Sequence, residues 1–147
     1  MGKQSSIDQL NSFLRGELSA VETYRMALEK LDEKSDARSD LELNLTSHQD
    51  RVALLRNAIV LCGGEPAESS GPWGVFAKTI ESGARLFGDK ASIAALEEGE
   101  DHGLKDYKKD SDELAAEPRR LMNTRLLPLQ QQSHDRMSAL KHRLAKS

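Results

Sequence analysis

Four segments of this 147-residue chain carry apolar residues at steps of about four and three, and each stripe includes one ionisable residue. Such steps place side chains on one face of an α-helix, against a partner helix. The four stripes are Leu10, Leu14, Glu17, Val21, Tyr24, Leu28 and Leu31; Leu41, Leu45, His48, Val52, Leu55, Ile59 and Cys62; Ile93, Leu96, Glu100 and Tyr107; and Leu127, Gln131, His134 and Met137. Because buried unpaired charges are costly, we expect the two glutamates and two histidines to neutralise one another, hold water, or bind a cation.

The first half of the chain predicts a helical hairpin. Ser6 is a suitable N-cap for a helix that reaches about Glu33, and a second helix is expected at about 36–61. The pair Gly63-Gly64 followed by Pro66 predicts the end of this second helix. We expect the two helices to be antiparallel neighbours.

The second half predicts another hairpin. Asp89 or Ser92 is expected to cap a third helix that ends near residue 116, and Pro118 fits the first turn of a fourth helix. Pro128 lies inside that fourth helix and lacks a backbone N–H. It predicts a kink or bulge one to two turns before His134.

A crossover of about residues 63–90 joins the hairpins. Its part from residue 63 to residue 83 holds five of the ten glycines of the chain, which argues against a long helix there. Pro72 is expected to open a short helix whose apolar side caps the bundle; this side consists of Trp73, Phe76, Ile80 and Phe87. The sequence therefore predicts one all-α domain over residues 1–147.

Composition limits the partners and the compartment. The 21 basic and 24 acidic residues are mixed along every segment, without the basic stripe that a nucleic acid needs. Cys62 is the single cysteine and cannot form an intramolecular disulfide. We find no apolar run long enough for a membrane span or a signal core, so a cytoplasmic setting is expected, with no nucleic acid or membrane partner.

An internal repeat relates the two hairpins. Gly16-Glu17 with Tyr24 in the first helix matches Gly99-Glu100 with Tyr107 in the third, at identical spacing. In the same way, the Ser-His pair at 47–48 in the second helix matches the pair at 133–134 in the fourth. A pseudo-twofold axis would then bring one glutamate and one histidine from each half to a common level.

At these residues the chain resembles the ferritin-like superfamily, and it is closest to small bacterial four-helix proteins of the bacterioferritin and rubrerythrin type. The two glutamates that precede a tyrosine by seven residues are similar to the single-glutamate helices of di-iron members. The two histidines are similar to those of the Glu-x-x-His motif on the other two helices. The resemblance implies a ferritin-like bundle of two hairpins, joined by a long crossover with a short helix.

The resemblance also implies a metal site for iron or manganese. Its ligands would be Glu17, His48, Glu100 and His134, with Tyr24, Tyr107 and Gln131 supporting them. The chain departs from the family pattern three residues before each histidine, where Leu45 and Gln131 replace the expected glutamates. Without those carboxylates, the candidates are a site for a single ion, the remnant of a site, or a closed hydrogen-bonded network that needs no metal.

The sequence leaves several functions open. One is a metalloprotein that reacts with oxygen or peroxide in a stress response. An alternative is a metal-free, non-enzymatic bundle that acts by self-association, as a homo-oligomer, or by binding a partner. A third is a bundle that holds a small ligand between its helix pairs, under the crossover.

Overall fold

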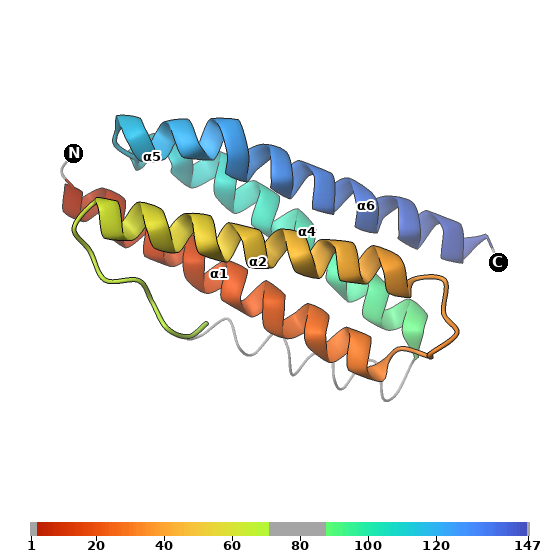
Figure 1. Ribbon diagram of the computed structural model, residues 1–147. Helices are drawn as coiled ribbons and strands as arrows, with labels where there is room; N and C mark the ends of the chain where they lie inside the picture. The colour runs from red at the N-terminus through yellow and green to blue at the C-terminus, as the bar shows by residue number, and fades with distance from the viewer. Residues whose placement is uncertain (1–2, 71–87, 147) are drawn as a thin grey trace.

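The computed structural model describes residues 3–70 and 88–146, which form long helices without a strand (Figure 1). The helices are α1 (Lys3–Lys30), α2 (Arg38–Leu61), α4 (Asp89–Asp110), α5 (Ala116–Leu121) and α6 (Leu127–Ala145), with a 3-10 turn η2 (Ser111–Glu113) and a π-helical segment η3 (Met122–Leu126). Because α5, η3 and α6 follow one another without a gap, they make one continuous fourth rod.

The four rods form an all-α bundle of two hairpins, as predicted. The helix α1 packs mainly against α2, and α4 mainly against α6 (Figure 1). The turn between α4 and α5 lies at the end of the bundle where α1 begins. At that end, the backbone N–H of Ala115 donates a hydrogen bond to the hydroxyl of Ser6 at 2.8 Å.

Several predicted boundaries are corrected. Ser6 is buried within α1 and is not its N-cap, because its hydroxyl accepts the bond from Ala115. The N-cap of α4 is Gly88, at φ 80°, rather than Asp89 or Ser92. This helix ends at Asp110, earlier than predicted, because the chain tightens into η2 and is then extended.

The end of α2 is the predicted glycine stop. Gly63 has a φ of 84°, in the left-handed region that favours glycine. Its N–H donates to the carbonyl of Val60, and the N–H of Gly64 donates to that of Ile59, both at 2.9 Å. These two bonds form a Schellman motif, which satisfies carbonyls that the helix end would leave free.

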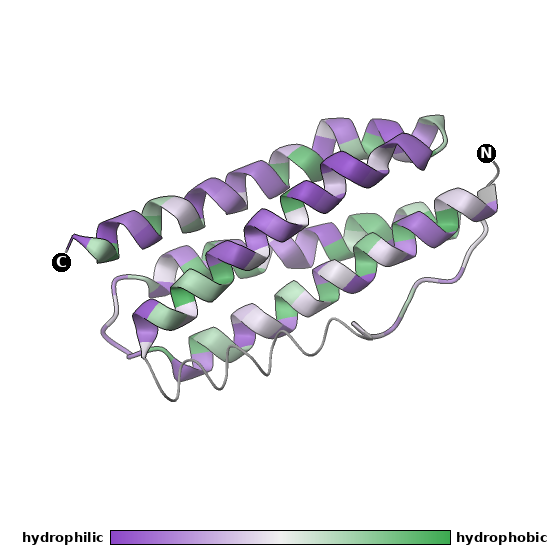
Figure 2. Cartoon of the chain, turned by 180° about the vertical axis from the view of Figure 1, so that it is seen from behind, coloured by the Kyte–Doolittle hydropathy of each residue, from purple (hydrophilic) through white to green (hydrophobic). Residues whose placement is uncertain are grey.

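The core consists of two apolar clusters with a polar layer between them. One cluster contains Leu10, Leu14, Val52, Leu55, Ile59, Met122 and Leu126, among others. The second contains Ala27, Leu31, Leu41, Ile93, Leu96, Met137 and Leu140, among others. Figure 2 shows hydrophobic and hydrophilic residues interspersed along every helix, as expected for rods that bury only one face.

The fourth rod contains an irregularity, as predicted, but the π-helical segment η3 ends two residues before Pro128 and lies more than two turns before His134 rather than one to two. Pro118 lies in the first turn of α5, and Pro128 is the second residue of α6. In η3 the N–H of Leu127 donates to the carbonyl of Met122, five residues earlier, which is a π-helical bond. The buried positions from 118 to 130 follow steps of four, which exceed an α-helical turn, and the wider π turn accommodates them.

The predicted crossover helix, from Pro72 with the apolar side of Trp73, Phe76, Ile80 and Phe87, lies outside the described residues. Among the helices that are described, none combines the length and the apolar character needed to cross a membrane.

Candidate functional site

A buried histidine joins two buried glutamates at the middle of the bundle. Glu17 lies on α1, His48 on α2 and Glu100 on α4, and each is at most 5% exposed. The Nδ1 atom of His48 lies 2.8 Å from Oε2 of Glu17, and its Nε2 atom lies 2.7 Å from Oε2 of Glu100. Ionised carboxylates only accept hydrogen bonds, so both ring nitrogens donate and His48 is an imidazolium. The structure thus brings three of the four predicted ligands together.

Two buried tyrosines bond the glutamates in a crossed arrangement. Tyr24, on the helix of Glu17, donates its hydroxyl to Oε2 of Glu100 at 2.6 Å. Tyr107, on the helix of Glu100, donates to Oε1 of Glu17 at 2.9 Å. Each of these two helices therefore supplies the tyrosine that bonds the glutamate of the other helix. The pseudo-twofold relation expected from the repeat thus holds for α1 and α4.

An arginine that the sequence analysis missed lies beside the histidine. Arg51, on α2, is 0% exposed and is the largest fully buried side chain among the described residues. Its Nε atom lies 3.5 Å from Oε2 of Glu17. The guanidinium also donates to four neutral oxygens: the carbonyl of Ser47 at 3.3 Å, the hydroxyls of Ser47 at 3.1 Å and Ser133 at 2.9 Å, and the amide oxygen of Gln130. This side chain supplies a second buried cation.

The sequence contains a signal for Arg51. Leu41, Asn44, His48, Arg51 and Leu55 follow steps of three and four, like the apolar stripes. All five are buried in the structure. A polar residue flanked on its own helical face by buried leucines is therefore a candidate for the interior.

The fourth rod and α2 add neutral donors to the network. Gln130 donates to Oε1 of Glu100 at 3.0 Å, and the hydroxyl of Ser133 donates to the same oxygen at 2.6 Å. Asn44 donates to the hydroxyl of Tyr24 at 2.9 Å and to the carbonyl of Ser133 at 3.0 Å. Among the described residues, every buried side-chain nitrogen or oxygen has a hydrogen-bond partner.

The predicted register of the fourth helix is wrong by one residue from Leu127 to His134, whereas Met137 is buried as predicted. His134 does not enter the interior; its Nε2 atom lies 2.5 Å from Asp101 on α4, near the surface. Gln131 is exposed and bonds Asp135. The buried stripe is instead Leu126, Gln130, Ser133, Met137 and Leu140, whose steps of four and three are regular and follow the π turn.

The two cations keep the two glutamates ionised. Burial alone raises the pKa of Glu100, but His48 and Arg51 outweigh it and lower this pKa to about 2. Burial likewise raises the pKa of Glu17, whereas Arg51 and His48 hold it below its usual value. Burial and Arg51 lower the pKa of His48, but the two carboxylates outweigh them and raise it. Two carboxylates, one imidazolium and one guanidinium make a neutral cluster.

This arrangement does not fit a metal ion between the glutamates. A metal here would have to displace a proton from the buried His48 and would add positive charge beside Arg51, although these two cations already balance the two carboxylates. All four carboxylate oxygens of Glu17 and Glu100 already accept hydrogen bonds. Nε2 of His48 also lies 3.3 Å from Nη2 of Arg51. Because both groups are donors here, this is a close approach of two cations and not a hydrogen bond.

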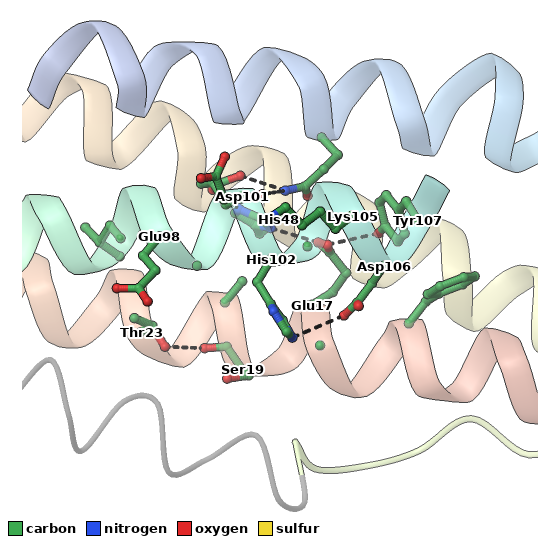
Figure 3. A pocket seen from close by; sticks show the side chains of 18 of the residues that line it. Glu17, Ser19, Thr23, His48, Glu98, Asp101, His102, Lys105, Asp106 and Tyr107 are labelled. Carbon is green, nitrogen blue, oxygen red and sulfur yellow. Dashed lines mark hydrogen bonds and ion pairs between the residues drawn. The ribbon is translucent and has the colours of Figure 1, made fainter. Parts of the chain in front are cut away.

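A pocket lies between α1 and α4 and reaches this network (Figure 3). It has a volume of about 810 Å³. Its apolar lining includes Phe13, Ala20 and Leu96, and its polar lining includes Ser12, Ser19, Thr23, Glu98, His102, Lys105, Asp106 and Asp110. Glu17, Tyr24, His48, Glu100, Tyr107 and Gln130 of the network also line it. We call this space the α1–α4 pocket.

Two glycines that line the α1–α4 pocket differ in what an added side chain would meet. Gly16 of α1 and Gly103 of α4 both line it. A Cβ atom added at Gly16 would meet nothing within 4 Å, whereas one at Gly103 would come within 2.9 Å of Gln130. Gly16 therefore faces open space, while Gly103 makes room for a side chain of the network.

Comparisons of the chain with models of protein families, with curated proteins and with solved structures found no match.

Proposed function

We propose that this chain is a ferritin-like four-helix bundle that needs no metal in its interior and binds a small organic cation in the α1–α4 pocket. The observation that carries this proposal is the buried pair of cations. His48 and Arg51 already neutralise the two glutamates that a ferritin-like metal would use. The charge that a metal would supply is thus present in the side chains themselves.

The size and walls of the α1–α4 pocket support a small organic ligand. Its volume of about 810 Å³ falls in the range of pockets that hold such molecules. Phe13, Ala20 and Leu96 offer apolar contact, and the hydroxyls of Ser12 and Ser19 offer polar contact. The charged network at the inner side of the pocket is already fixed by its own hydrogen bonds. A ligand would therefore bind against a preorganised surface.

The charge at the pocket supports a cationic ligand. Glu98, Asp106 and Asp110 line it, and they outnumber the lysine, Lys105. Burial raises the pKa of Asp106; His102 opposes this rise, and Asp110 adds to it by like-charge repulsion. A ligand ammonium near this pair would relieve the repulsion. We therefore favour an amine with an apolar body.

Three six-carbon probes test this proposal by NMR titration of the backbone amides. Hexylamine, hexanol and hexanoate each contain six carbons in an unbranched chain, and their polar head groups are cationic, neutral and anionic respectively. We expect hexylamine to shift the amides of Gly16 and Gly103 at lower concentration than hexanol does, and hexanoate to have the weakest effect. Equal responses to all three probes would contradict a cationic ligand, and no response would contradict the pocket.

A variant whose new side chain occupies the pocket, with a control variant outside it, tests where the ligand binds. Gly16→Leu places a side chain in open space and should abolish hexylamine binding without unfolding the protein. Ala53→Leu adds the same side chain to an exposed position on α2, outside the pocket, and should bind like the unaltered chain. Binding that survives in Gly16→Leu would rule out the α1–α4 pocket as the site.

The second candidate is the iron or manganese protein with a role in oxidative stress. The observation that favours it is the crossed pairing of two glutamates and two tyrosines at one level of the bundle. It requires His48 to lose a proton and Arg51 to withdraw. Elemental analysis after anaerobic addition of Fe(II) or Mn(II) tests it, with a Glu17→Ala, His48→Ala double variant as the comparison. Stoichiometric metal that the double variant lacks would support the metalloprotein over our proposal.

A further inference from the structure

Three potential metal ligands meet where α4 and α6 pack together, outside the buried network. Glu97 and Asp101 lie one turn apart on α4, and His134 lies on α6. One ligand atom from each residue lies within 4.8 Å of the other two. All three side chains are partly buried, so their positions are restricted but water can reach them.

His134 is oriented as a metal-binding histidine would be. Its Nδ1 atom lies 3.1 Å from Oδ1 of Asp135. Asp135 is held in turn by the amide of Gln131 at 2.9 Å. Metal-binding histidines usually donate their second N–H to a carboxylate, which fixes the ring. The other nitrogen, Nε2, lies 2.5 Å from Oδ1 of Asp101, and an ion would bind between these two atoms by displacing the proton that they share.

The charge around His134 also favours a cation. Glu97, Asp101 and Asp135 are carboxylates, and Lys141 forms a salt bridge with Glu97 at 3.6 Å. The side chain of Lys141 is 51% exposed. A pair this exposed is weak, so Lys141 can leave Glu97 at little cost.

We propose that Glu97, Asp101 and His134 form a mononuclear site for Zn²⁺ that bridges α4 and α6. One imidazole nitrogen and two carboxylate oxygens are common Zn²⁺ ligands, and a water molecule would complete four-coordination. Zinc bonds of about 2.0–2.2 Å place two ligands no more than about 4.4 Å apart. Small side-chain rotations of Glu97 and Asp101 therefore suffice, and no helix has to move. This proposal is independent of the α1–α4 pocket.

Calorimetric titration with Zn²⁺ of metal-free protein tests the site. We expect one Zn²⁺ per chain, and at least tenfold weaker binding in both His134→Ala and Asp101→Asn. The matched controls are His142→Ala, an exposed histidine on α6, and His102→Ala, an exposed histidine on α4; both should bind like the unaltered chain. Unchanged binding in His134→Ala, or the same loss in either control, would overturn the proposal.

Removing the competing lysine gives a test in the opposite direction. Lys141→Gln leaves all three ligands in place and should tighten Zn²⁺ binding several-fold, because Glu97 loses its cationic partner. Weaker binding in this variant would count against Glu97 as a ligand. The Glu17→Ala, His48→Ala double variant separates this site from the interior. If Zn²⁺ binding required that pair instead of His134, the site would not be the one proposed here.

Discussion

The helices α2 and α6 are related by the internal repeat, yet they meet the polar layer differently. The two serines of the repeat are equivalent, because Ser47 and Ser133 both accept hydrogen bonds from Arg51. The two histidines are not equivalent, because His48 lies between the glutamates and His134 lies near the surface.

The two helices also differ one turn after these histidines. The position that corresponds to Arg51 is Met137, which is fully buried in an apolar cluster. The helix α2 therefore supplies both cations that contact the glutamates, whereas α6 supplies the neutral donors Gln130 and Ser133 to Glu100. Two glutamates need two cations, and a third in the same interior would be uncompensated. Charge balance, more than repeat symmetry, accounts for which residues face inward.

The largest effect is expected when α2 is given the residue that α6 has at the position equivalent to Arg51. Arg51→Met copies the residue of α6 and leaves two buried carboxylates with a single cation. We expect a loss of about 3–5 kcal/mol in the free energy of unfolding, measured by urea denaturation at pH 7. The matched control Met137→Leu should cost less than about 1.5 kcal/mol. Similar losses in the two variants would mean that Arg51 contributes only packing.

The histidines offer the next largest contrast. His48→Gln removes a buried imidazolium and its bonds to two carboxylates, and we expect a loss of about 3 kcal/mol in the free energy of unfolding. His134→Gln changes a partly exposed ion pair and should cost less than about 1 kcal/mol. Urea denaturation of both variants measures this difference. Equal costs would show that the interior does not depend on the charge of His48.

The pH dependence of stability tests the charges directly. The pKa of Glu100 falls from 4.5 to about 2 on folding, so its stabilisation is present above pH 4.5 and is lost as the pH drops toward 2. This change in pKa corresponds to about 3 kcal/mol in the free energy of unfolding. The pKa of His48 is raised, so its stabilisation is present below pH 6.5 and is lost as the pH rises through the raised pKa.

Urea denaturation from pH 2 to pH 10 should therefore show maximum stability between these limits. Glu100→Gln should flatten the acid side of the profile, and His48→Gln should flatten the alkaline side. A Glu100→Gln profile as steep in acid as that of the unaltered chain would contradict the assignment of the acid transition to Glu100.

The tyrosines provide the smallest and most symmetric test. Tyr24→Phe and Tyr107→Phe each remove one hydroxyl that donates to a buried carboxylate. We expect each to cost about 2 kcal/mol, because hydrogen bonds to charged groups contribute more than neutral ones. Thermal unfolding of both variants should give similar shifts. A large effect of one variant alone would show that the crossed pairing is less symmetric than the distances indicate.

The sequence alone determined the four rods and much of the polar layer. Glu17, His48 and Glu100 stand on regular stripes flanked by apolar residues, so periodicity placed them inside. The glycines at 63–64 similarly predicted the end of α2, because a left-handed residue at that point satisfies the last carbonyls of the helix. These features depend on local spacing and backbone chemistry, which the sequence contains.

The register of the fourth rod and the role of Arg51 depend on how the helices pack together. The sequence pattern predicted the stripe that starts at Leu127, but a neighbouring stripe that starts at Leu126 is the one that faces the interior. The π turn selects the stripe that starts at Leu126 and so turns His134 away from the interior. Arginine is usually a surface residue, and the glutamate that Arg51 compensates lies on another helix. Helix packing brings these charges together, and the cost of a buried unpaired charge then determines which residues remain inside.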